Sequence, residues 1–255
     1  MTGCRIKRLQ QALSGSVLFG SHKISRVKQT SSTNDDLKNA WLLPEIAEQI
    51  RIADYQTAGR GQHERNWLAR PGQSLLFSFS LVGVQNSFPL SMIAGLAVYS
   101  SLNRLASQPG SGLWLKWPND VWLNRGKLAG ILCEGCSIRD RQYWVVGIGI
   151  NLVPLSGADF AAASFSEISD NPDSDAILCE FFADFERLLT EDAGSLVRKW
   201  STAASVFWQT KFLFLNSGVP DFCGLPLAVE ADGTLLVRSD DEKSCRLLSA
   251  TLKPL

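Results

Sequence analysis

The stretch of sequence that decides how this chain folds is Leu113-Trp114-Leu115-Lys116-Trp117-Pro118-Asn119-Asp120-Val121-Trp122-Leu123. Apolar residues flank Pro118-Asn119-Asp120, and Pro, Asn and Asp are residues that tight turns favour. We therefore predict two short strands, 113–117 and 121–123, that are joined by a turn. Lys127 follows in the next predicted strand between apolar neighbours. Because a buried ammonium group is costly unless it is paired, Lys127 either meets an anionic ligand or extends to solvent.

The segments on either side of this stretch alternate between strand and helix patterns. Strands are predicted over 23–28, 51–56, 74–81, 128–134 and 143–152, and helices over 35–41, 89–106, 174–189 and 193–206. From Phe207 the pattern changes to short strands, with Asp232-Gly233 as a hairpin turn. The sequence thus predicts an α+β fold, in which a mainly β core with packed helices precedes a small β module. We divide the chain into a preamble (1–22), a main domain (23–208) and a C-terminal module (209–255).

The composition limits the classes of function. The chain has 255 residues, is 45% hydrophobic and has 25 basic and 25 acidic residues, so it has no net charge with which to attract DNA or an anionic membrane. No apolar run reaches the length of a membrane span, and the basic N-terminus lacks the apolar stretch of a signal peptide. The first 22 residues are too few for a helix-turn-helix domain. We expect a cytoplasmic protein with no membrane or DNA partner.

The six cysteines and two histidines do not form a metal-binding pattern. Cys133 and Cys136 are the only close pair of cysteines, and no second pair lies nearby. Such a pair can serve redox chemistry or hold a metal, but scattered cysteines in a chain of this kind are typical of reduced core residues. We predict no protein-bound structural metal.

Four polar clusters fall at the ends of predicted strands and are candidates for a site. The segment 59–65 combines two glycines with Arg60 and Arg65, which suits a phosphate but equally a surface loop. The others are the Lys116–Asp120 stretch, Ser32-Thr33-Asn34, which also suits a helix cap, and Gly147-Ile148-Gly149-Ile150-Asn151. Glycines two apart in an apolar strand indicate close approach by a ligand or a neighbouring segment.

Taken together, these clusters resemble the biotin–protein ligase family, in order and in spacing. The matching stretches are Ser32-Thr33-Asn34, Gln56 to Gly61 with Arg65 and Trp67, Lys116 to Asp120, Lys127 to Leu132 with Glu134, and Gly147 to Asn151. The resemblance covers about residues 24–200 firmly and the C-terminal module more loosely. The chain is similar to the monofunctional members that lack an N-terminal DNA-binding domain.

The resemblance implies a fold, a reaction and partners. The fold would be a class II synthetase-like mixed sheet with helices, in which 23–208 is the catalytic domain, followed by a small SH3-like β-barrel. Biotin would react with ATP and Mg²⁺ to give biotinyl-5′-AMP, and a lysine of the biotin carboxyl carrier protein or domain of acetyl-CoA carboxylase would then accept the biotin. Members of the family also often form homodimers through their sheets.

The resemblance also assigns roles to individual residues. Lys127 and Arg60 would be the catalytic residues. The biotin-binding set would be Ser32, Thr33, Asn34, Gln56, Arg60, Gly61, Gln62 and Lys127. The ATP-binding set would be Arg60, Arg65, Trp67, Asn119, Lys127 and Asn151. Asp120 would either assist Mg²⁺ or shape the turn.

Three other functions fit parts of this pattern. A lipoate or octanoate transferase shares the architecture, but octanoyl transfer needs a cysteine nucleophile, and only Cys133 falls within the matching clusters. A biotin-sensing repressor would need a DNA-binding domain. A degenerate ligase that binds biotin without turnover is suggested by two departures from the family pattern, at Gln62 and Glu64.

Gln62 stands where many members of the family carry an arginine, and Glu64 where glycine is usual. Glu64 would repel phosphate unless a cation neutralises it, or else it points to solvent. The chain ending Ser249-Ala250-Thr251-Leu252-Lys253-Pro254 also differs from the usual Gly-Glu-hydrophobic-Ser-Leu-Arg, which puts the detailed role of the module in question.

The Gln62→Arg variant tests the first departure. Loss of one charge-assisted hydrogen bond is worth about 1.5–3 kcal/mol, so we expect biotinyl-5′-AMP to dissociate at least about tenfold more slowly from Gln62→Arg than from the wild type. Stopped-flow dissociation of the pre-formed intermediate measures both rates. Equal rates would contradict the idea that Gln62 loosens retention of the intermediate and allows diffuse acylation of nearby lysines.

Overall fold

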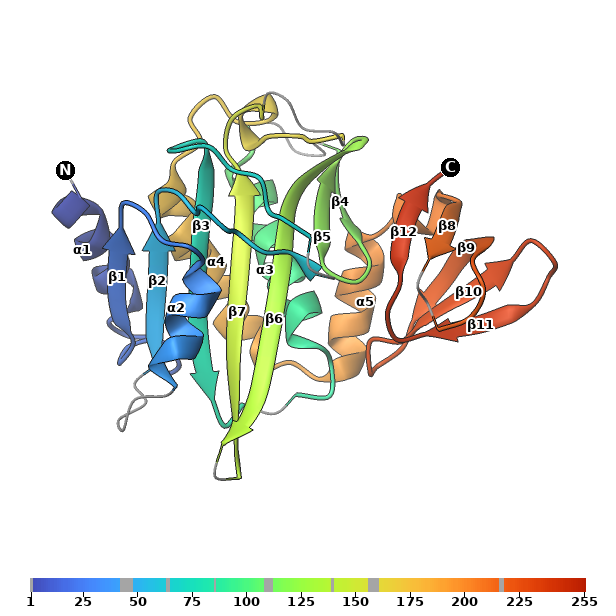
Figure 1. The fold of residues 1–255 in the computed structure, drawn as a ribbon, viewed down its shortest axis with the longest axis horizontal. Helices are drawn as coiled ribbons and strands as arrows, with labels where there is room; N and C mark the ends of the chain where they lie inside the picture. Colours follow the sequence, from blue (N-terminus) through green and yellow to red (C-terminus); the bar gives the residue numbers. More distant parts are fainter. Residues whose placement is uncertain are drawn as a thin grey trace.

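Two β-sheets lie side by side in the computed structural model (Figure 1). The structure describes residues 2–41, 48–62, 65–84, 86–107, 112–138, 140–155, 161–215 and 218–255, with side chains from residue 6 onward. The larger sheet has seven strands in the order β1-β2-β3-β7-β6-β5-β4, and the smaller sheet has five in the order β11-β10-β9-β8-β12. The mixed sheet followed by a separate β module confirms the predicted α+β class.

The larger sheet is mixed because its first two strands run parallel and all other neighbours run antiparallel. Its strands are β1 (Lys23–Val27), β2 (Gln49–Ala53), β3 (Ser74–Val82), β4 (Leu113–Lys116), β5 (Asp120–Leu123), β6 (Gly126–Ile138) and β7 (Arg141–Asn151). Residues 113–123 form the predicted hairpin, with β4 one residue shorter and β5 one residue longer than expected, and with Lys116 opposite Asp120. The turn that joins these two strands contains a cis peptide bond between Trp117 and Pro118.

Helices cover both faces of the larger sheet. They are α1 (Thr2–Leu13), α2 (Thr33–Ala40), α3 (Leu90–Leu105), α4 (Ser174–Leu189) and α5 (Ala193–Ala203), with short 3₁₀ helices η2 (Phe165–Glu167) and η3 (Phe207–Gln209). α2 lies in front of the sheet and α3, α4 and α5 lie behind it (Figure 1). The back of the sheet holds most of the core, where aromatic side chains of β3 and α4 interlock.

The N-terminal segment is part of this core. Leu9 and Leu13 of α1 are buried, and Phe19 packs edge-on against Phe79 and Phe182. Leu9 and Leu13 therefore lie on the buried face of α1, and Phe19 extends this apolar contact into the turn that follows the helix.

The C-terminal module is a five-stranded antiparallel sheet. Its strands are β8 (Phe212–Leu215), β9 (Phe222–Val229), β10 (Leu235–Ser239), β11 (Ser244–Leu247) and β12 (Thr251–Pro254). The predicted SH3-like barrel is not closed, because β11 and β12 are the two edge strands of this sheet. Four of the five strands have only four or five residues, which limits the curl that closure would require.

The core continues from one sheet to the other. The rings of Phe207 and Phe212 lie 5.0 Å apart across the predicted boundary near residue 208, and one cluster of buried residues spans both sides. The division at residues 22 and 208 thus remains a prediction. Among the described residues, no helix combines the length and the apolar character that crossing a bilayer requires.

The burial of Phe19 can be tested by truncating it. Phe19→Ala removes a fully buried ring that packs on three other phenylalanine rings, so we expect a loss of about 3–5 kcal/mol in the free energy of unfolding. Urea denaturation measures this loss. Val17→Ala, in the same segment but at a side chain that is 99% exposed, is the matched control and should stay within about 0.5 kcal/mol of the wild type. Equal stabilities for the two variants would show that residues 1–22 do not stabilise the core.

Candidate active site

Two glycines form a flat patch on the front of the larger sheet. Gly130 of β6 pairs with Gly149 of β7, and the segment between β2 and β3 crosses the sheet here (Figure 1). The Trp67 ring of this segment lies directly on the patch. A side chain on either glycine would collide with the ring, because a Cβ at Gly149 would lie 2.4 Å from it and a Cβ at Gly130 would lie 3.0 Å from it. The close approach predicted from the glycine spacing is therefore made by a neighbouring segment of the chain.

A third glycine makes room for the first turn of α2. A Cβ at Gly147 would lie 2.1 Å from Oδ1 of Asn34. The amide group of Asn34 donates to Oε2 of Glu134 at 2.9 Å, and its Oδ1 accepts a hydrogen bond from Ser78 at 2.6 Å. The amide is thus fixed in orientation against the sheet.

Side chains at the start of α2 form a buried hydrogen-bond network. Ser32 caps the helix by accepting from the Asp35 N–H, as its sequence suggested. The Thr33 hydroxyl donates to Oε1 of Gln56 at 2.9 Å and lies 2.6 Å from the Ser78 hydroxyl. Polar side chains held in this way are preorganised for a polar ligand.

Arg60 lies over this network and is neutralised by carboxylates. Its guanidinium group is 2.5 Å from Asp35 and 2.9 Å from Glu134. Glu134 also pairs with Lys38 at 2.7 Å. Burial opposes ionisation of Glu134, but hydrogen bonds from Lys38 and Asn34, together with the charge of Arg60, outweigh it and lower its pKa.

Two lysines share one carboxylate at the other end of the site. The Lys127 ammonium is 2.6 Å from Asp120, and the Lys116 ammonium is 3.7 Å from the same side chain. Burial lowers the pKa of Lys116, and the nearby charges of Lys127 and Arg65 lower it further against the attraction of Asp120. Burial would raise the pKa of Asp120, yet Lys127 and Lys116 outweigh it and lower that pKa. Lys127 therefore meets an anion of the protein itself.

Two asparagines hold the backbone around these lysines. The Asn119 amide donates to the Ile131 carbonyl at 2.5 Å, and the Ile131 N–H donates back to the Asn119 carbonyl at 3.0 Å. The Asn151 amide donates to the carbonyls of Lys127 and Ala163. Oδ1 of Asn151 is buried and has no partner among the described residues, which leaves an acceptor for a ligand.

The predicted residues converge on two adjoining cavities. A narrow slot of about 50 Å³ is lined by Ser32, Thr33, Asn34, Gln56, Arg60, Gly61, Gln62, Trp67, Asn119 and Lys127. A second cavity of about 570 Å³ is lined by Arg65, Asn151 and five of the same residues, Gly61, Gln62, Trp67, Asn119 and Lys127. The slot must widen to admit a ligand of ordinary size. Glu64, the other departure noted in the sequence, lies outside the described residues.

Several residues of the site were not singled out from the sequence. Ser78, which joins Thr33 to Asn34, is one of three buried serines in β3, and the sequence alone does not separate it from Ser74 and Ser80. The residues of β12 that line the second cavity could not be predicted from the sequence, because their position depends on how the C-terminal module packs against the larger sheet. There the Arg65 guanidinium group donates to the Thr251 hydroxyl at 2.6 Å.

The fold and the arrangement of this site agree with comparisons against known proteins. Residues 26–151, which include all twelve predicted site residues, match the model of the biotin/lipoate A/B protein ligase family. This segment, about half of the chain, belongs to that family.

Two curated relatives that the chain resembles carry the same function in their names. It is 41% identical over 138 residues to the biotin–[acetyl-CoA-carboxylase] ligase of Mycobacterium tuberculosis, covering 52% of this chain and 50% of that protein. It is 43% identical over 142 residues to the ligase of the same name from Paracoccus denitrificans, covering 53% and 55%. The chain thus spans about half the length of these curated relatives.

A solved structure extends the likeness of fold over nearly the whole chain. The biotin protein ligase from Aquifex aeolicus in complex with biotin and ATP superposes with a TM-score of 0.73. The match covers 91% of this chain and 99% of that one at 24% sequence identity, so it supports the fold alone.

Because Lys116 and Lys127 share the Asp120 carboxylate, substitution of Asp120 should reduce stability far more than substitution of Lys116. Asp120→Asn leaves Lys116 and Lys127 without their anion, so we expect a loss of about 3–5 kcal/mol in stability. Lys116→Met keeps the Asp120–Lys127 pair and removes a buried charge, so it should change stability little or raise it. Urea denaturation at neutral pH compares the two variants, and equal losses would contradict this account.

The same comparison has a defined pH dependence. The folded-state pKa of Asp120 lies below its ordinary 3.8, so the wild type's advantage over Asp120→Asn is complete above about pH 4 and is lost as the pH falls through the folded-state pKa.

Proposed function

We propose that this chain is a biotin–protein ligase. It activates biotin with ATP to form biotinyl-5′-AMP and pyrophosphate, and then transfers biotin to a lysine of the biotin carboxyl carrier domain of acetyl-CoA carboxylase. The observation that carries the proposal is that Lys127 and the loop of Arg60, Gly61 and Gln62 line one slot, which continues into a second cavity. The names of the relatives support the choice of biotin and of the carboxylase.

Each cavity suits one reactant. In the proposal, Ser32, Thr33, Asn34 and Gln56 hold the ureido head group of biotin, whose donors and acceptors match their hydroxyl and amide groups. Arg65, Trp67, Asn119 and Asn151 serve the nucleotide. Oδ1 of Asn151, which has no partner in the described part of the chain, would accept a hydrogen bond from the nucleotide. Lys127, Arg60, Gly61 and Gln62 lie where the carboxylate and the α-phosphate meet.

The chemistry requires positioning and positive charge rather than a protein nucleophile. The biotin carboxylate oxygen attacks the α-phosphorus, and pyrophosphate leaves with the electron pair of the broken P–O bond. The acceptor lysine first loses one proton from its ammonium group, and the free amine bonds to the carbonyl carbon. AMP leaves with the electron pair of the broken C–O bond, and the nitrogen loses a second proton and keeps the one of the amide. Lys127 and Arg60 would offset the repulsion between the two anionic reactants and stabilise charge on the phosphorus.

Magnesium fits the site as a companion of the triphosphate. Mg²⁺ bound to a nucleotide commonly takes one or two protein carboxylates besides the phosphates and water. Asp120 is the one carboxylate among the described residues that line the second cavity, and because its two oxygens already face Lys127 and Lys116, the ion would be held mainly by the phosphates and water. The ion would supply further positive charge to the departing pyrophosphate.

An acyl transfer through a protein cysteine is disfavoured at this site. Burial raises the pKa of the Cys133 thiol well above its ordinary value, and the Glu134 carboxylate raises it further. Such a thiol is a poor nucleophile at neutral pH. The predicted absence of DNA binding, the possible homodimer and the cytoplasmic location remain predictions, which a gel-shift assay, sedimentation and cell fractionation would test.

The Lys127→Ala variant tests the centre of the proposal. Removing a preorganised cation costs about 3–4 kcal/mol of barrier, so biotin-dependent release of pyrophosphate from ATP should slow by roughly 10²–10³. Lys243→Ala, at an exposed lysine paired only with Asp241 among the described residues, is the matched control and should match the wild type. A wild-type rate in Lys127→Ala would refute the assigned role.

Mass spectrometry of the carrier domain shows which acid, biotin or lipoate, the enzyme attaches to it. Incubation of the wild type with ATP, Mg²⁺, a carrier domain and either biotin or lipoate should add only the mass of biotin. Addition of lipoate alone would favour a lipoate transferase. Absence of pyrophosphate release with biotin would indicate a degenerate ligase that only binds.

A further inference from the structure

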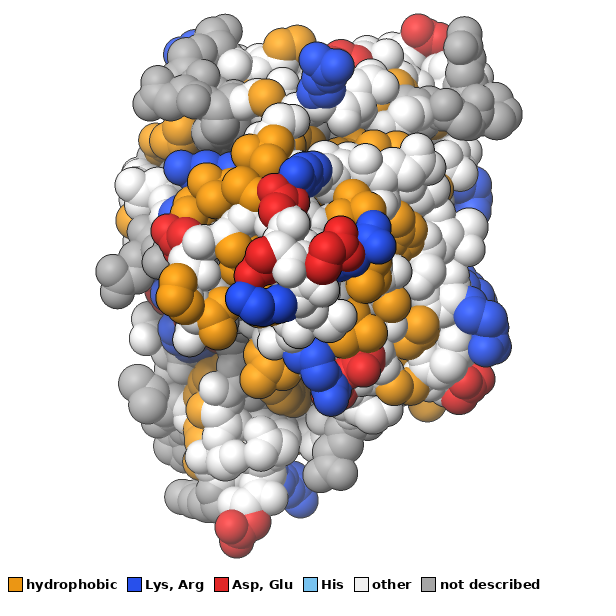
Figure 2. Space-filling model, turned by 90° about the vertical axis from the view of Figure 1, so that its right-hand side faces the viewer, with side chains coloured by type: hydrophobic (Ala, Val, Ile, Leu, Met, Phe, Trp, Pro, Cys, Tyr) orange, Lys and Arg blue, Asp and Glu red, His pale blue; other side chains and the backbone are white. Residues whose placement is uncertain are grey.

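An ion-pair network at the site differs from the ion pairs at the outer surface. On the face of the C-terminal module, charged side chains of both signs are interspersed (Figure 2), and the pair of Arg246 with Glu230 is largely exposed. Such exposed pairs contribute little to stability. The Glu134 side chain of β6 is only 22% exposed and bonds to partners from two other segments of the chain. Charge-assisted hydrogen bonds in such a setting fix the geometry of the groups that make them.

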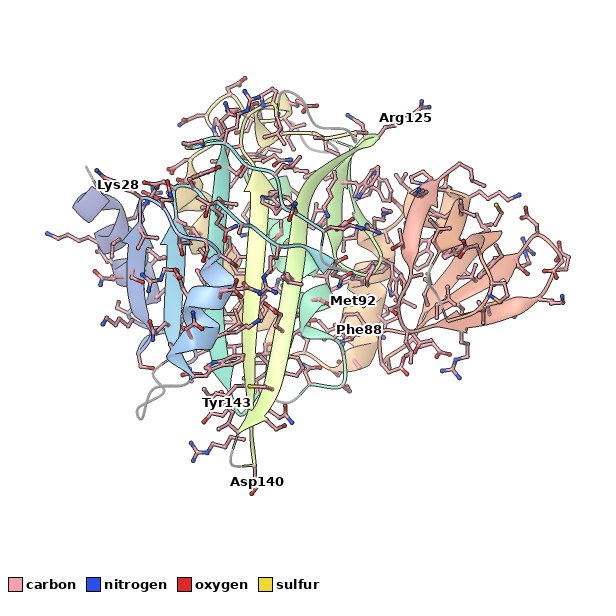
Figure 3. The ribbon with its side chains drawn as sticks, in the orientation of Figure 1. Lys28, Phe88, Met92, Arg125, Asp140 and Tyr143 are labelled. Carbon is pink, nitrogen blue, oxygen red and sulfur yellow. The ribbon has the colours of Figure 1, made fainter. Side chains whose placement is uncertain are left out.

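Glu134 connects the biotin-binding set to the catalytic arginine. β6 crosses the sheet from the side of Arg125 to the turn at Asp140 (Figure 3), and Glu134 lies in its second half. Its Oε2 accepts hydrogen bonds from the Asn34 amide and from Nη2 of Arg60, both at 2.9 Å. One carboxylate oxygen thus bonds to a residue of α2 and to a residue of the segment between β2 and β3.

The Glu134 carboxylate is ionised at neutral pH. Burial opposes ionisation, but hydrogen bonds from Lys38 and Asn34, together with the charge of Arg60, lower its pKa. The Lys38 ammonium donates to Oε1 at 2.7 Å, which leaves Oε2 for Asn34 and Arg60. The carboxylate therefore remains a charged acceptor under the conditions of an ordinary assay.

Arg60 is anchored through one of its three nitrogens. Nη2 donates to Asp35 at 2.5 Å and to Glu134 at 2.9 Å, which uses both of its hydrogens. Nε and Nη1 have no hydrogen-bond partner among the residues that the structure describes. A guanidinium group has five N–H donors, so the three on Nε and Nη1 stay available to an anionic ligand.

The anchoring carboxylates lie outside the slot. Arg60 lines both the slot and a wider groove of about 800 Å³, whereas Asp35 and Glu134 line the groove but not the slot. One wall of this groove belongs to the C-terminal module, which the hydrogen bond from the Trp117 indole to the Gly233 carbonyl, 2.9 Å long, joins to the β4–β5 turn. An unanchored arginine in so wide a groove would occupy many rotamers. The two carboxylates restrict Arg60 without taking space from a reactant.

We propose that Glu134, assisted by Asp35, is a positioning residue that holds Arg60 and the biotin head-group site in a fixed relation. The inference rests on the proposed function, in which Arg60 lies at the reacting centre and Asn34 lies beside the head group. Loss of Glu134 acts twice, because the free donors of Arg60 lose their direction and the Asn34 amide can turn away. Asp35 contributes to the first effect through its own bond to Arg60.

The Glu134→Gln variant tests this role. Glutamine keeps the size but not the charge, and its amide would direct N–H donors at the cations. We expect the maximal single-turnover rate of biotinyl-5′-AMP formation to fall at least about tenfold, since a misplacement of about 1 Å can cost about 10²-fold in rate. The biotin concentration at half-maximal rate should rise. Glu191→Gln is the matched control, because the Glu191 side chain is 17% exposed and pairs with two cations away from the site; both of its constants should match the wild type.

An Arg60→Met background shows whether Glu134 acts through the arginine. Methionine removes the guanidinium group, so adding Glu134→Gln should change the maximal rate by less than about twofold in that background. The half-saturating biotin concentration should still rise, because that effect runs through Asn34. A merely structural role would lower the rate by the same factor in both backgrounds and would overturn the proposal.

The other outcomes separate the positioning role from the ligase function. Wild-type constants for Glu134→Gln, or an equal loss in Glu191→Gln, overturn the positioning role and leave the ligase function intact. If circular dichroism shows that Glu134→Gln does not fold, Asp35→Asn removes the other anchor of Arg60 at a more exposed position. An unchanged rate in Asp35→Asn, or a fall that persists in the Arg60→Met background, overturns the proposal. Absence of biotinyl-5′-AMP formation by the wild type refutes the ligase function.

Discussion

One buried carboxylate allows the site to hold two lysines. Asp120 accepts Lys127 at 2.6 Å and lies 3.7 Å from Lys116, which is almost fully buried. Without an anion between them, two ammonium groups so close would repel each other and would favour solvent. The β4–β5 hairpin sets this spacing, because it pairs Lys116 directly with Asp120, and β6 then brings Lys127 to the same place. The position of the proposed catalytic cation thus depends on local strand geometry.

Much of this arrangement could be predicted from the sequence, because its determinants are local. The Pro118-Asn119-Asp120 turn, the capping serine of α2 and the glycines of β7 each depend on a few neighbouring residues. Lys127 left two possibilities open, an anionic ligand or solvent, and the structure gave a third, in which the anion is a side chain of the protein. Asp120 is visible in the sequence, but its distance from the Lys127 ammonium group is not.

The features that escaped prediction depend on packing between distant segments. The burial of Phe19 against α4 requires residues more than 160 positions apart to meet. The module was expected to close into a barrel, yet its two edge strands remain unpaired with each other. Its contacts with Trp117 and Arg65 likewise depend on how the two sheets lie side by side, which no local pattern records.

The hydrogen bond from Trp117 to Gly233 has a consequence for how the molecule unfolds. It joins the hairpin turn of the small sheet to the most buried part of the β4–β5 turn, while Phe207 and Phe212 carry the core across the same junction. Separation of the two sheets would therefore open the interior of both to water at once. Units coupled in this way melt together, so a calorimeter should record a single cooperative heat-absorption peak rather than two.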